Sequence, residues 1–261
     1  MKFSIITVCY NAASTISATL NSIIAQQHVE LEVIVIDGAS TDGTVDIVRG
    51  FGNSINHFIS ETDNGIYDAM NKGVRLATGD VIGFLNADDF YVSNSVLEKI
   101  QHGFKTNKTT VVAGAVEQIN ALGQTKRIIC SESYVKNGFC WGMMLPHPAT
   151  FVSKSLFDRV GIFATKYKIA GDFDFFVRLC CHPDFHLTTL EETIVKMRIG
   201  GVSTMGLRSY LLLSREFKQS LIENGFSNHH WRIDLRIFRK IKQLRPWSAL
   251  SRKAAGTHSG G

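Results

Sequence analysis

Paired cysteines are missing from this sequence. Its five cysteines are odd in number, and none of them stands in a C-x-x-C pair. This pattern argues against a disulfide framework and a zinc site, and it favours reduced thiols in the cytosol. No apolar run approaches the roughly 20 residues that a membrane-spanning helix needs. No signal peptide precedes the strand-like residues that begin at Phe3, so we expect a cytoplasmic protein.

An even spread of positive charge is missing as well. The formal net charge is +5, but eight basic residues and one acid lie between Asn228 and Lys253. The rest of the chain carries 20 basic and 22 acidic residues and is close to neutral. The body of the protein therefore gives no indication of a nucleic-acid partner, and only the C-terminal segment is basic enough to meet a polyanion.

Strand-like and helix-like segments alternate in the first third of the chain. A length of 261 residues allows one large α/β domain or two small ones, and a hydrophobic content of 44% with a charged content of 20% is typical of a globular protein. We expect strands at 3–8, 31–36 and 55–60, and helices at 14–27, 45–49 and 66–77, with Ser14 capping the first helix. This order predicts a parallel sheet with ligand loops at the strand ends.

The alternation is lost in the second half, which predicts mixed or antiparallel pairing there. We expect strands at 81–85, 111–120, 125–130 and 188–197, a strand and short helix within 151–160, and helices at 95–106, 170–179, 207–224 and 231–247. The last of these helices is basic and amphipathic with tryptophan at both ends, which is typical of a helix at a membrane surface. A helix packed on the domain, or an oligomer contact, is the alternative.

Two adjacent carboxylates follow the apolar strand at 81–85. The segment reads Asn86, Ala87, Asp88 and Asp89, and it lies at the carboxyl end of a predicted parallel strand, where open α/β sheets bind their ligands. Oxygen ligands without His or Cys suit a hard cation such as Mg²⁺ or Mn²⁺, which usually binds together with substrate phosphates. Both aspartates are equally compatible with capping the next helix or turn. The residues alone leave the two interpretations open.

Two predicted helices carry polar residues that a purely structural helix does not need. Helix 66–77 has four of them among its apolar positions, namely Tyr67, Asp68, Asn71 and Lys72. Side chains at this spacing share one face and can address a polar ligand together, although a solvated face has the same pattern. Asp172 and Asp174 stand in the first turn of helix 170–179, where the helix dipole favours acids, so capping is an alternative for both.

Four segments in a fixed order give the chain a family resemblance. They are residues 7–12 (TVCYNA), 37–44 (DGASTDGT), 86–89 (NADD) and 171–174 (GDFD). With these segments the chain resembles the family 2 glycosyltransferases, inverting enzymes of the GT-A fold, which are α/β proteins with a Rossmann-like mixed sheet. Residues 60–73 are similar to bacterial transferases that build surface polysaccharides of the colanic-acid and O-antigen type. We expect a GT-A domain at 1–204, a helical extension at 205–253 and a disordered tail at 254–261.

The resemblance implies a role for each matching residue. Asp172 corresponds to the general base that takes the proton of the acceptor hydroxyl, and Asp88 corresponds to the ligand of a Mn²⁺ or Mg²⁺ cofactor. Asp37 would accept a hydrogen bond from the base of the nucleotide, and Lys72 would bring positive charge to the phosphates. The full nucleotide-sugar set is Thr7, Tyr10, Asn11, Asp37, Asp42, Asp68, Lys72, Asn86, Ala87 and Asp88.

One departure from the family pattern concerns the metal. Asn86 stands where the family has the first acid of its motif, so we expect weaker affinity for the cation. On the acceptor side, Trp141 and His147 could contact a sugar, and Arg198 could reach the diphosphate, while packing alone is the alternative for His147.

The resemblance thus predicts sugar transfer from a UDP or GDP donor to a glycan or polyprenyl-linked acceptor. The expected place is the inner face of the cytoplasmic membrane, where segment 231–247 would meet an anionic surface. A non-catalytic sugar-nucleotide-binding subunit of a polysaccharide assembly complex is the alternative that Asn86 suggests. A nucleotidyltransferase is disfavoured because no Gly-rich, Lys- or Arg-bearing phosphate loop follows the first strand.

Overall fold

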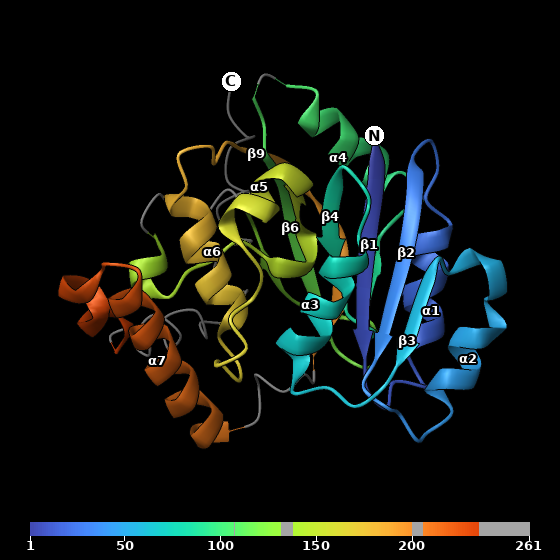
Figure 1. Ribbon diagram of the computed structural model, residues 1–261, viewed down its shortest axis with the longest axis horizontal. Helices are drawn as coiled ribbons and strands as arrows, with labels where there is room; N and C mark the ends of the chain where they lie inside the picture. The colour runs from blue at the N-terminus through green and yellow to red at the C-terminus, as the bar shows by residue number, and fades with distance from the viewer. Residues whose placement is uncertain (107, 132–137, 200–205, 235–261) are drawn as a thin grey trace, which may run out of the picture.

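The computed structural model describes residues 1–106, 108–131, 138–199 and 206–234. Within these ranges nine strands form one sheet, in the order β3-β2-β1-β4-β8-β6-β9-β5, with β7 paired to β6 outside this path. Figure 1 shows helices on both faces of this sheet. The chain is therefore a mixed α/β protein, as its sequence predicts.

The first part of the chain forms the parallel half of the sheet. β1 (Lys2–Cys9), β2 (Glu30–Asp37), β3 (His57–Ser60) and β4 (Val81–Phe84) alternate with α1 (Ile16–Ile24), α2 (Thr44–Gly50) and α3 (Ile66–Leu76). β1 pairs in parallel with β2 and β4, and β2 pairs in parallel with β3. Their carboxyl ends therefore share one edge of the sheet, which is where the predicted ligand loops begin.

The second part supplies antiparallel pairing. Its elements are β5 (Asp89–Tyr91), α4 (Val96–Phe104), β6 (Val111–Ile119), β7 (Thr125–Ile129), β8 (Thr150–Ser153), α5 (Lys154–Val160), α6 (Gly171–Cys181), β9 (Leu187–Arg198) and α7 (Gly206–Glu223). β8 runs antiparallel to β4 and β6, β9 runs parallel to β6, and β5 runs antiparallel to β9. The mixed sheet that the sequence predicts for this half is confirmed.

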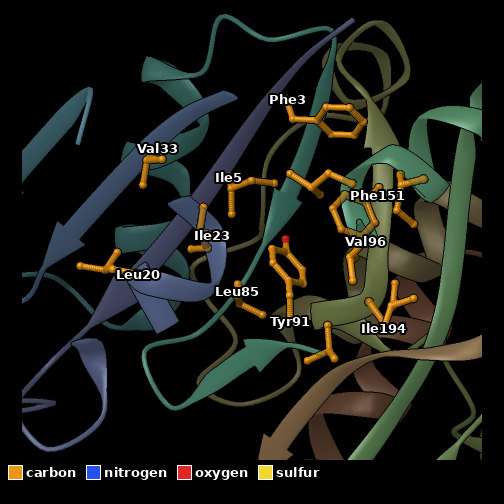
Figure 2. Close-up of a cluster of buried hydrophobic side chains, with 14 of the residues drawn as sticks. Phe3, Ile5, Leu20, Ile23, Val33, Leu85, Tyr91, Val96, Phe151 and Ile194 are labelled. Carbon is orange, nitrogen blue, oxygen red and sulfur yellow. The ribbon is translucent and has the colours of Figure 1, made fainter. Parts of the chain in front are cut away.

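Alternate side chains of the central strands divide the core into two layers. Phe3 and Ile5 of β1 belong to the layer that also contains Leu20 and Ile23 of α1. Figure 2 shows these side chains in one cluster that also includes Phe151 and Tyr91. The neighbouring β1 residues Ile6 and Val8 belong to the layer formed with α3, α5 and α6. Because strand side chains point alternately to opposite faces, the near-continuous apolar strand at 3–8 is buried on both sides.

A third cluster attaches α7 to the sheet domain. The rings of Phe173 in α6 and Phe217 in α7 stack at 3.8 Å and 12°, and Val177 and Leu221 are buried beside them. Figure 1 places α7 on the side of the molecule away from β3. α7 therefore packs directly on the helix that begins at Gly171.

Some local predictions were wrong. α1 begins at Ile16 and its N-cap residue is Thr15, without a side-chain capping bond, so Ser14 does not cap it. A backbone turn does so instead, because Ala12 O accepts from the N–H groups of Thr15 and Ile16 at 3.0 and 2.9 Å. β5 was not foreseen, because three residues carry little local pattern and its partner β9 lies about 100 positions later in the chain.

The structure describes only the first four residues of the helix that the sequence predicts at 231–247. Ser227–Ile233 forms a 3₁₀ helix, not the start of the α-helix expected at 231–247, and positions 235–261 lie outside the described residues. None of the helices in the described ranges is both long enough and apolar enough to cross a membrane.

Candidate active site

An acidic turn follows β4 at the carboxyl edge of the sheet. The strand continues its pairing for one residue, because Leu85 N donates to Ile6 O at 3.0 Å, and the chain then turns as Asp89 N donates to Asn86 O at 3.0 Å. Asp89 is already the first residue of β5. Asp88 therefore lies in a short turn between two strands of the sheet.

The carboxyl group of Asp89 is buried without a partner. The residue is 1% exposed, and neither carboxyl oxygen has a hydrogen-bond partner among the described residues. Burial raises the pKa of Asp89 well above its usual range, and the charge of Asp88 adds to this effect. Burial also raises the pKa of Asp88, while the nearby Arg198 opposes the shift. A bound cation would offset these costs, since it stabilises ionised carboxylates.

The interpretation that this pair caps the next helix was wrong. α4 begins only at Val96, its N-cap residue is Ser95, and no side chain makes the capping bond. Hard oxygen donors with unpartnered lone pairs are what Mg²⁺ or Mn²⁺ prefers. Across the described part of the chain, no three His, Cys, Asp or Glu side chains gather closely enough to hold a metal by themselves. A cation at Asp88 would therefore complete its shell with other oxygens, such as those of a diphosphate.

Arg198, at the end of β9, is held at the acidic turn. Its Nη1 donates to the backbone oxygen of Asp88 at 2.8 Å, and its guanidinium lies over the ring of Phe90, 4.9 Å from the centroid. Arg198 therefore lies next to Asp88, the candidate metal ligand. Its contact with a diphosphate stays a prediction. The glycines that follow it lie outside the described residues.

Asp37, at the end of β2, is buried and bonded to the chain's own donors. Its oxygens accept from Ser40 N at 2.9 Å and from Ser60 Oγ at 2.7 Å, and Ser40 Oγ donates to it as well. Burial opposes ionisation of Asp37, but these hydrogen bonds outweigh it and lower its pKa. The hydroxyl of Thr7, in the neighbouring strand, is buried without a partner among the described residues.

The loops after β1 and β2 are tied together. Asn11 N donates to Ser40 Oγ at 2.8 Å, Thr41 N donates to Asn11 Oδ1 at 2.9 Å, and Ala13 N donates to Asp42 Oδ2 at 3.0 Å. Asn11 takes a positive φ of 50° to make these bonds. Tyr10 beside it is 67% exposed. The two loops therefore form one fixed rim with an exposed aromatic ring.

Lys72 of α3 is surrounded by acids. Its Nζ lies 2.6 Å from Asp63, 2.7 Å from Glu61 and 3.9 Å from Asp68. The hydrogen bonds that Lys72 donates to Asp63 and Glu61 raise the pKa of Lys72, so the ammonium stays charged. Much of its charge is balanced within the protein. Glu61 and Asp63 were not foreseen as its partners, although both stand in the loop directly before α3.

Asp172 is the second residue of α6 and is fixed from two sides. Its Oδ1 accepts from the Tyr67 hydroxyl at 3.1 Å and from Phe173 N at 2.8 Å. Burial raises the pKa of Asp172 to about 6, although these hydrogen bonds oppose the shift. A carboxyl group with this pKa can accept and release a proton near neutral pH.

Asp174, in the same turn, has a structural role. It is 4% exposed, pairs with Arg178 Nε at 2.9 Å and accepts from Ser220 Oγ of α7 at 2.9 Å. Asp174 therefore links α6 to α7, and only Asp172 of the two remains available for chemistry.

Aromatic rings connect the end of β4, the strand before the acidic turn, to Asp172. Phe84, the last residue of β4, lies edge-on to Phe163 at 5.3 Å, and Phe163 stacks on Tyr67 at 5.9 Å. Tyr67 in turn contacts Asp172. These contacts link Asp172 to the strand that ends just before the acidic turn, although Asp88 and Asp172 are 84 positions apart in the chain.

His147 and Trp141, both expected on the acceptor side, contact other residues of the protein. The ring of His147 lies among Phe84, Phe163 and Phe176 at 5.1, 5.7 and 5.8 Å, and burial lowers its pKa to about 4. It is therefore neutral at physiological pH. Trp141 carries the guanidinium of Arg232 over its ring at 5.0 Å.

Gly171 permits the close approach of α6 to Tyr67. A Cβ atom at this position would lie 2.7 Å from Cδ2 of the Tyr67 ring. We expect Gly171→Ala to lower the free energy of unfolding by roughly 1–3 kcal/mol, because the ring or the helix must shift. Urea unfolding measures this. Gly50→Ala is the control, because its Cβ meets no heavy atom within 4 Å; equal stability of the two variants would contradict the prediction.

Several known proteins are similar to this chain over most of its length. The family model described as "Glycosyl transferase family 2" matches residues 4–159. A PGL/p-HBAD biosynthesis glycosyltransferase of Mycobacterium bovis is 28% identical over 224 residues, which are 84% of this chain and 83% of that protein. An uncharacterized glycosyltransferase of Mycobacterium tuberculosis is 30% identical over 189 residues, covering 69% of this chain and 70% of that protein.

Solved structures share the fold. S. aureus TarS 1-349 in complex with UDP-GlcNAc superposes with a TM-score of 0.68 at 19% identity, covering 91% of this chain and 72% of that one. A mannosyltransferase from Pyrobaculum calidifontis, in complex with GDP-Man and Mn²⁺, superposes with a TM-score of 0.64 at 17% identity, covering 97% of this chain and 79% of that one.

Proposed function

The chain belongs to glycosyltransferase family 2 and has the GT-A fold. On this premise we propose that it transfers a sugar from a nucleoside diphosphate to a glycan or lipid-linked acceptor and inverts the anomeric configuration of that sugar. The observation that carries the proposal is Asp172, a fixed carboxyl group with a pKa of about 6 that is linked through Tyr67, Phe163 and Phe84 to the strand before the acidic turn. We place the reaction in the synthesis of a bacterial surface polysaccharide.

In the proposed reaction Asp172 acts as the general base. The acceptor oxygen attacks the anomeric carbon on the face opposite the diphosphate, and its proton passes to a carboxyl oxygen of Asp172. The bond between the anomeric carbon and the diphosphate oxygen breaks, and the nucleoside diphosphate leaves with that electron pair. One displacement from the opposite face inverts the anomeric configuration. Tyr67 and Phe173 N hold one oxygen of Asp172, which leaves the other for the acceptor.

The residues of the acidic turn fit a divalent cation. Asp88 would hold it, with the neutral oxygen of Asn86 and the unpartnered carboxyl group of Asp89 close by in the same turn. When bound, Mn²⁺ or Mg²⁺ supplies positive charge for the leaving diphosphate. The Mn²⁺ in the complex of the similar mannosyltransferase supports this assignment.

The nucleotide is proposed to bind at the rim formed by the loops after β1 and β2. The similar structures hold UDP-GlcNAc and GDP-Man, so both uridine and guanosine donors are included. The exposed ring of Tyr10 offers a stacking surface for the base, and Thr7 would lie buried beneath this rim. Asn11, Asp37 and Asp42 would shape this rim. Lys72 and Asp68 would border the sugar diphosphate, and Ala87 would line the turn beside it.

The pH dependence of the reaction follows from Asp172. A general base works only when it is ionised, so kcat/KM should rise about tenfold per pH unit up to about pH 6 and then level off. Initial rates across this range, with tryptophan fluorescence to verify that the protein stays folded, measure this. A flat profile from about pH 5 to 8 would contradict the assignment of Asp172.

A donor screen tests the proposal itself. The purified chain is incubated with nucleotide sugars and Mn²⁺ or Mg²⁺, and released nucleoside diphosphate is measured with and without glycan or polyprenyl-linked acceptors. Release from one donor that depends on an acceptor is the expected result. The alternative, a non-catalytic sugar-nucleotide-binding subunit, is suggested by Asn86 and would show thermal stabilisation by a nucleotide without any release.

Association with the inner face of the membrane stays a prediction. It depends on segment 231–247, of which positions 235–247 lie outside the described residues. Binding to anionic vesicles that decreases with salt would support it, and absence of binding at low salt would remove it.

A further inference from the structure

Glu216 of α7 is a buried carboxylate bonded to the backbone just before Asp172. It is 6% exposed. Its Oε1 accepts from Lys168 N at 2.9 Å, and its Oε2 accepts from Ile169 N and Ala170 N at 3.0 Å each. The three hydrogen bonds from backbone N–H groups to this carboxylate are charge-assisted. Such bonds are stronger than those between neutral groups, and together they fix the orientation of the three peptide groups. One side chain therefore sets the path of the turn that leads into α6.

Tyr67 of α3 holds the same turn from the other side. Its hydroxyl lies 2.7 Å from the carbonyl oxygen of Ile169 and 3.1 Å from Oδ1 of Asp172. A phenol has one proton to donate, so the Tyr67 hydroxyl donates in turn to the Ile169 carbonyl oxygen and to the Asp172 carboxylate, which are both within hydrogen-bond distance. The hydroxyl is thus shared between the turn and the carboxyl group.

We propose that Glu216 and Tyr67 act as a clamp on residues 168–170 that positions the Asp172 carboxylate for proton transfer. Neither is a catalytic residue; both act through Asp172. The proposal rests on the proposed function and deepens it, because it assigns α7 a role in orienting the general base. The helix positions a reacting group 44 residues earlier in the chain, from Asp172 to Glu216.

Attachment of α7 does not require Glu216. Phe217 stacks on Phe173, Leu221 is fully buried, and Ser220 donates to Asp174, so the helix is anchored by its neighbours. A buried carboxylate is costly unless hydrogen bonds compensate it. Apolar contacts can hold a helix in place, but they cannot orient three successive peptide groups, and these groups lead directly to Asp172.

Glu216→Gln and Tyr67→Phe test the clamp, because each keeps the volume of its side chain. Glu223→Gln is the matched control: Glu223 is on the same helix and contacts the same loop, but through the side chains of Lys166 and Tyr167. Misplacement of a reacting group by about 1 Å can cost 10²-fold in rate. We expect each clamp variant to lower kcat by roughly 10–100-fold with the donor KM within about threefold of wild type, and Glu223→Gln to leave kcat within about threefold.

The outcomes separate the clamp from the proposed function. If Asp172→Asn abolishes transfer while Glu216→Gln and Tyr67→Phe keep the kcat of Glu223→Gln, the clamp is overturned and the function stands. If the wild-type chain transfers no sugar, the function itself fails. An effect of Glu216→Gln on donor KM alone also overturns the clamp. Should Glu216→Gln fail to fold, Tyr67→Phe decides, because a loss of kcat at unchanged KM supports the clamp and wild-type kcat overturns it.

Discussion

Replacing Asp172 with asparagine should lower kcat for sugar transfer by roughly 10²–10⁴-fold, the usual contribution of a general base. Asparagine keeps an oxygen for the bonds from Tyr67 and Phe173 N, so the turn is preserved while the proton acceptor is lost. Binding of the nucleoside diphosphate, measured by calorimetry, should stay within about threefold of wild type, since Asp172 has no part in it.

Asp172→Asn should also have a higher free energy of unfolding than wild type at alkaline pH. The folded-state pKa of Asp172 is raised to about 6, so the folded protein binds more protons than the unfolded chain between about pH 4 and 6, and stability falls as pH rises through this window. Asparagine lacks this cost, and its advantage should be present at pH 8 and absent at about pH 4. Asp158→Asn, at an exposed position of α5, is the control. If Asp172→Asn transferred sugar at the wild-type rate, the assignment of Asp172 as the general base would be wrong.

Replacing Asp88 with asparagine should reduce transfer by about 10²-fold or more at a cation concentration that saturates the native protein, because metal charge on a leaving group is worth several kcal/mol. Higher Mn²⁺ should restore part of the rate, since a neutral oxygen remains at the position. Initial rates over a Mn²⁺ titration measure both the loss and its recovery.

Asn86→Asp is the matched partner of this experiment. It adds a carboxylate to the acidic turn, and we expect it to lower the Mn²⁺ concentration for half-maximal rate. Loss of activity in Asn86→Asp would show that the neutral amide is required. Full wild-type activity in the presence of EDTA, or an Asp88→Asn variant indistinguishable from wild type, would contradict a role for a cation at this turn.

The sequence was informative wherever the pattern is local. The two-sided apolar runs at 3–8 and 31–36 predicted the parallel strands, and the loss of alternation after 81–85 predicted the mixed half of the sheet. Asp172 and Asp88 could be proposed as site residues because each stands in one of the four segments that carry the family resemblance, at the start or end of a predictable element. β5 could not, since its three residues are a strand only through pairing with β9.

The partners of the site residues were less accessible. Ser60 donates to Asp37 over 23 positions, and Glu216 accepts from a turn 46 to 48 positions away; such contacts exist only once the chain has folded. One signal was present for Glu216. It occupies the same helical face as Phe217 and Ser220, and a carboxylate on the buried stripe of a helix indicates a dedicated partner.

The configuration of the product tests the central claim most directly. With the donor and acceptor found by screening, proton NMR of the new glycoside reports its anomeric configuration through the coupling of the anomeric proton. Direct attack assisted by Asp172 predicts that an α-linked donor gives a β-linked product, and the reverse for a β-linked donor. A product that keeps the configuration of the donor would contradict the single displacement and the role of Asp172 as its base.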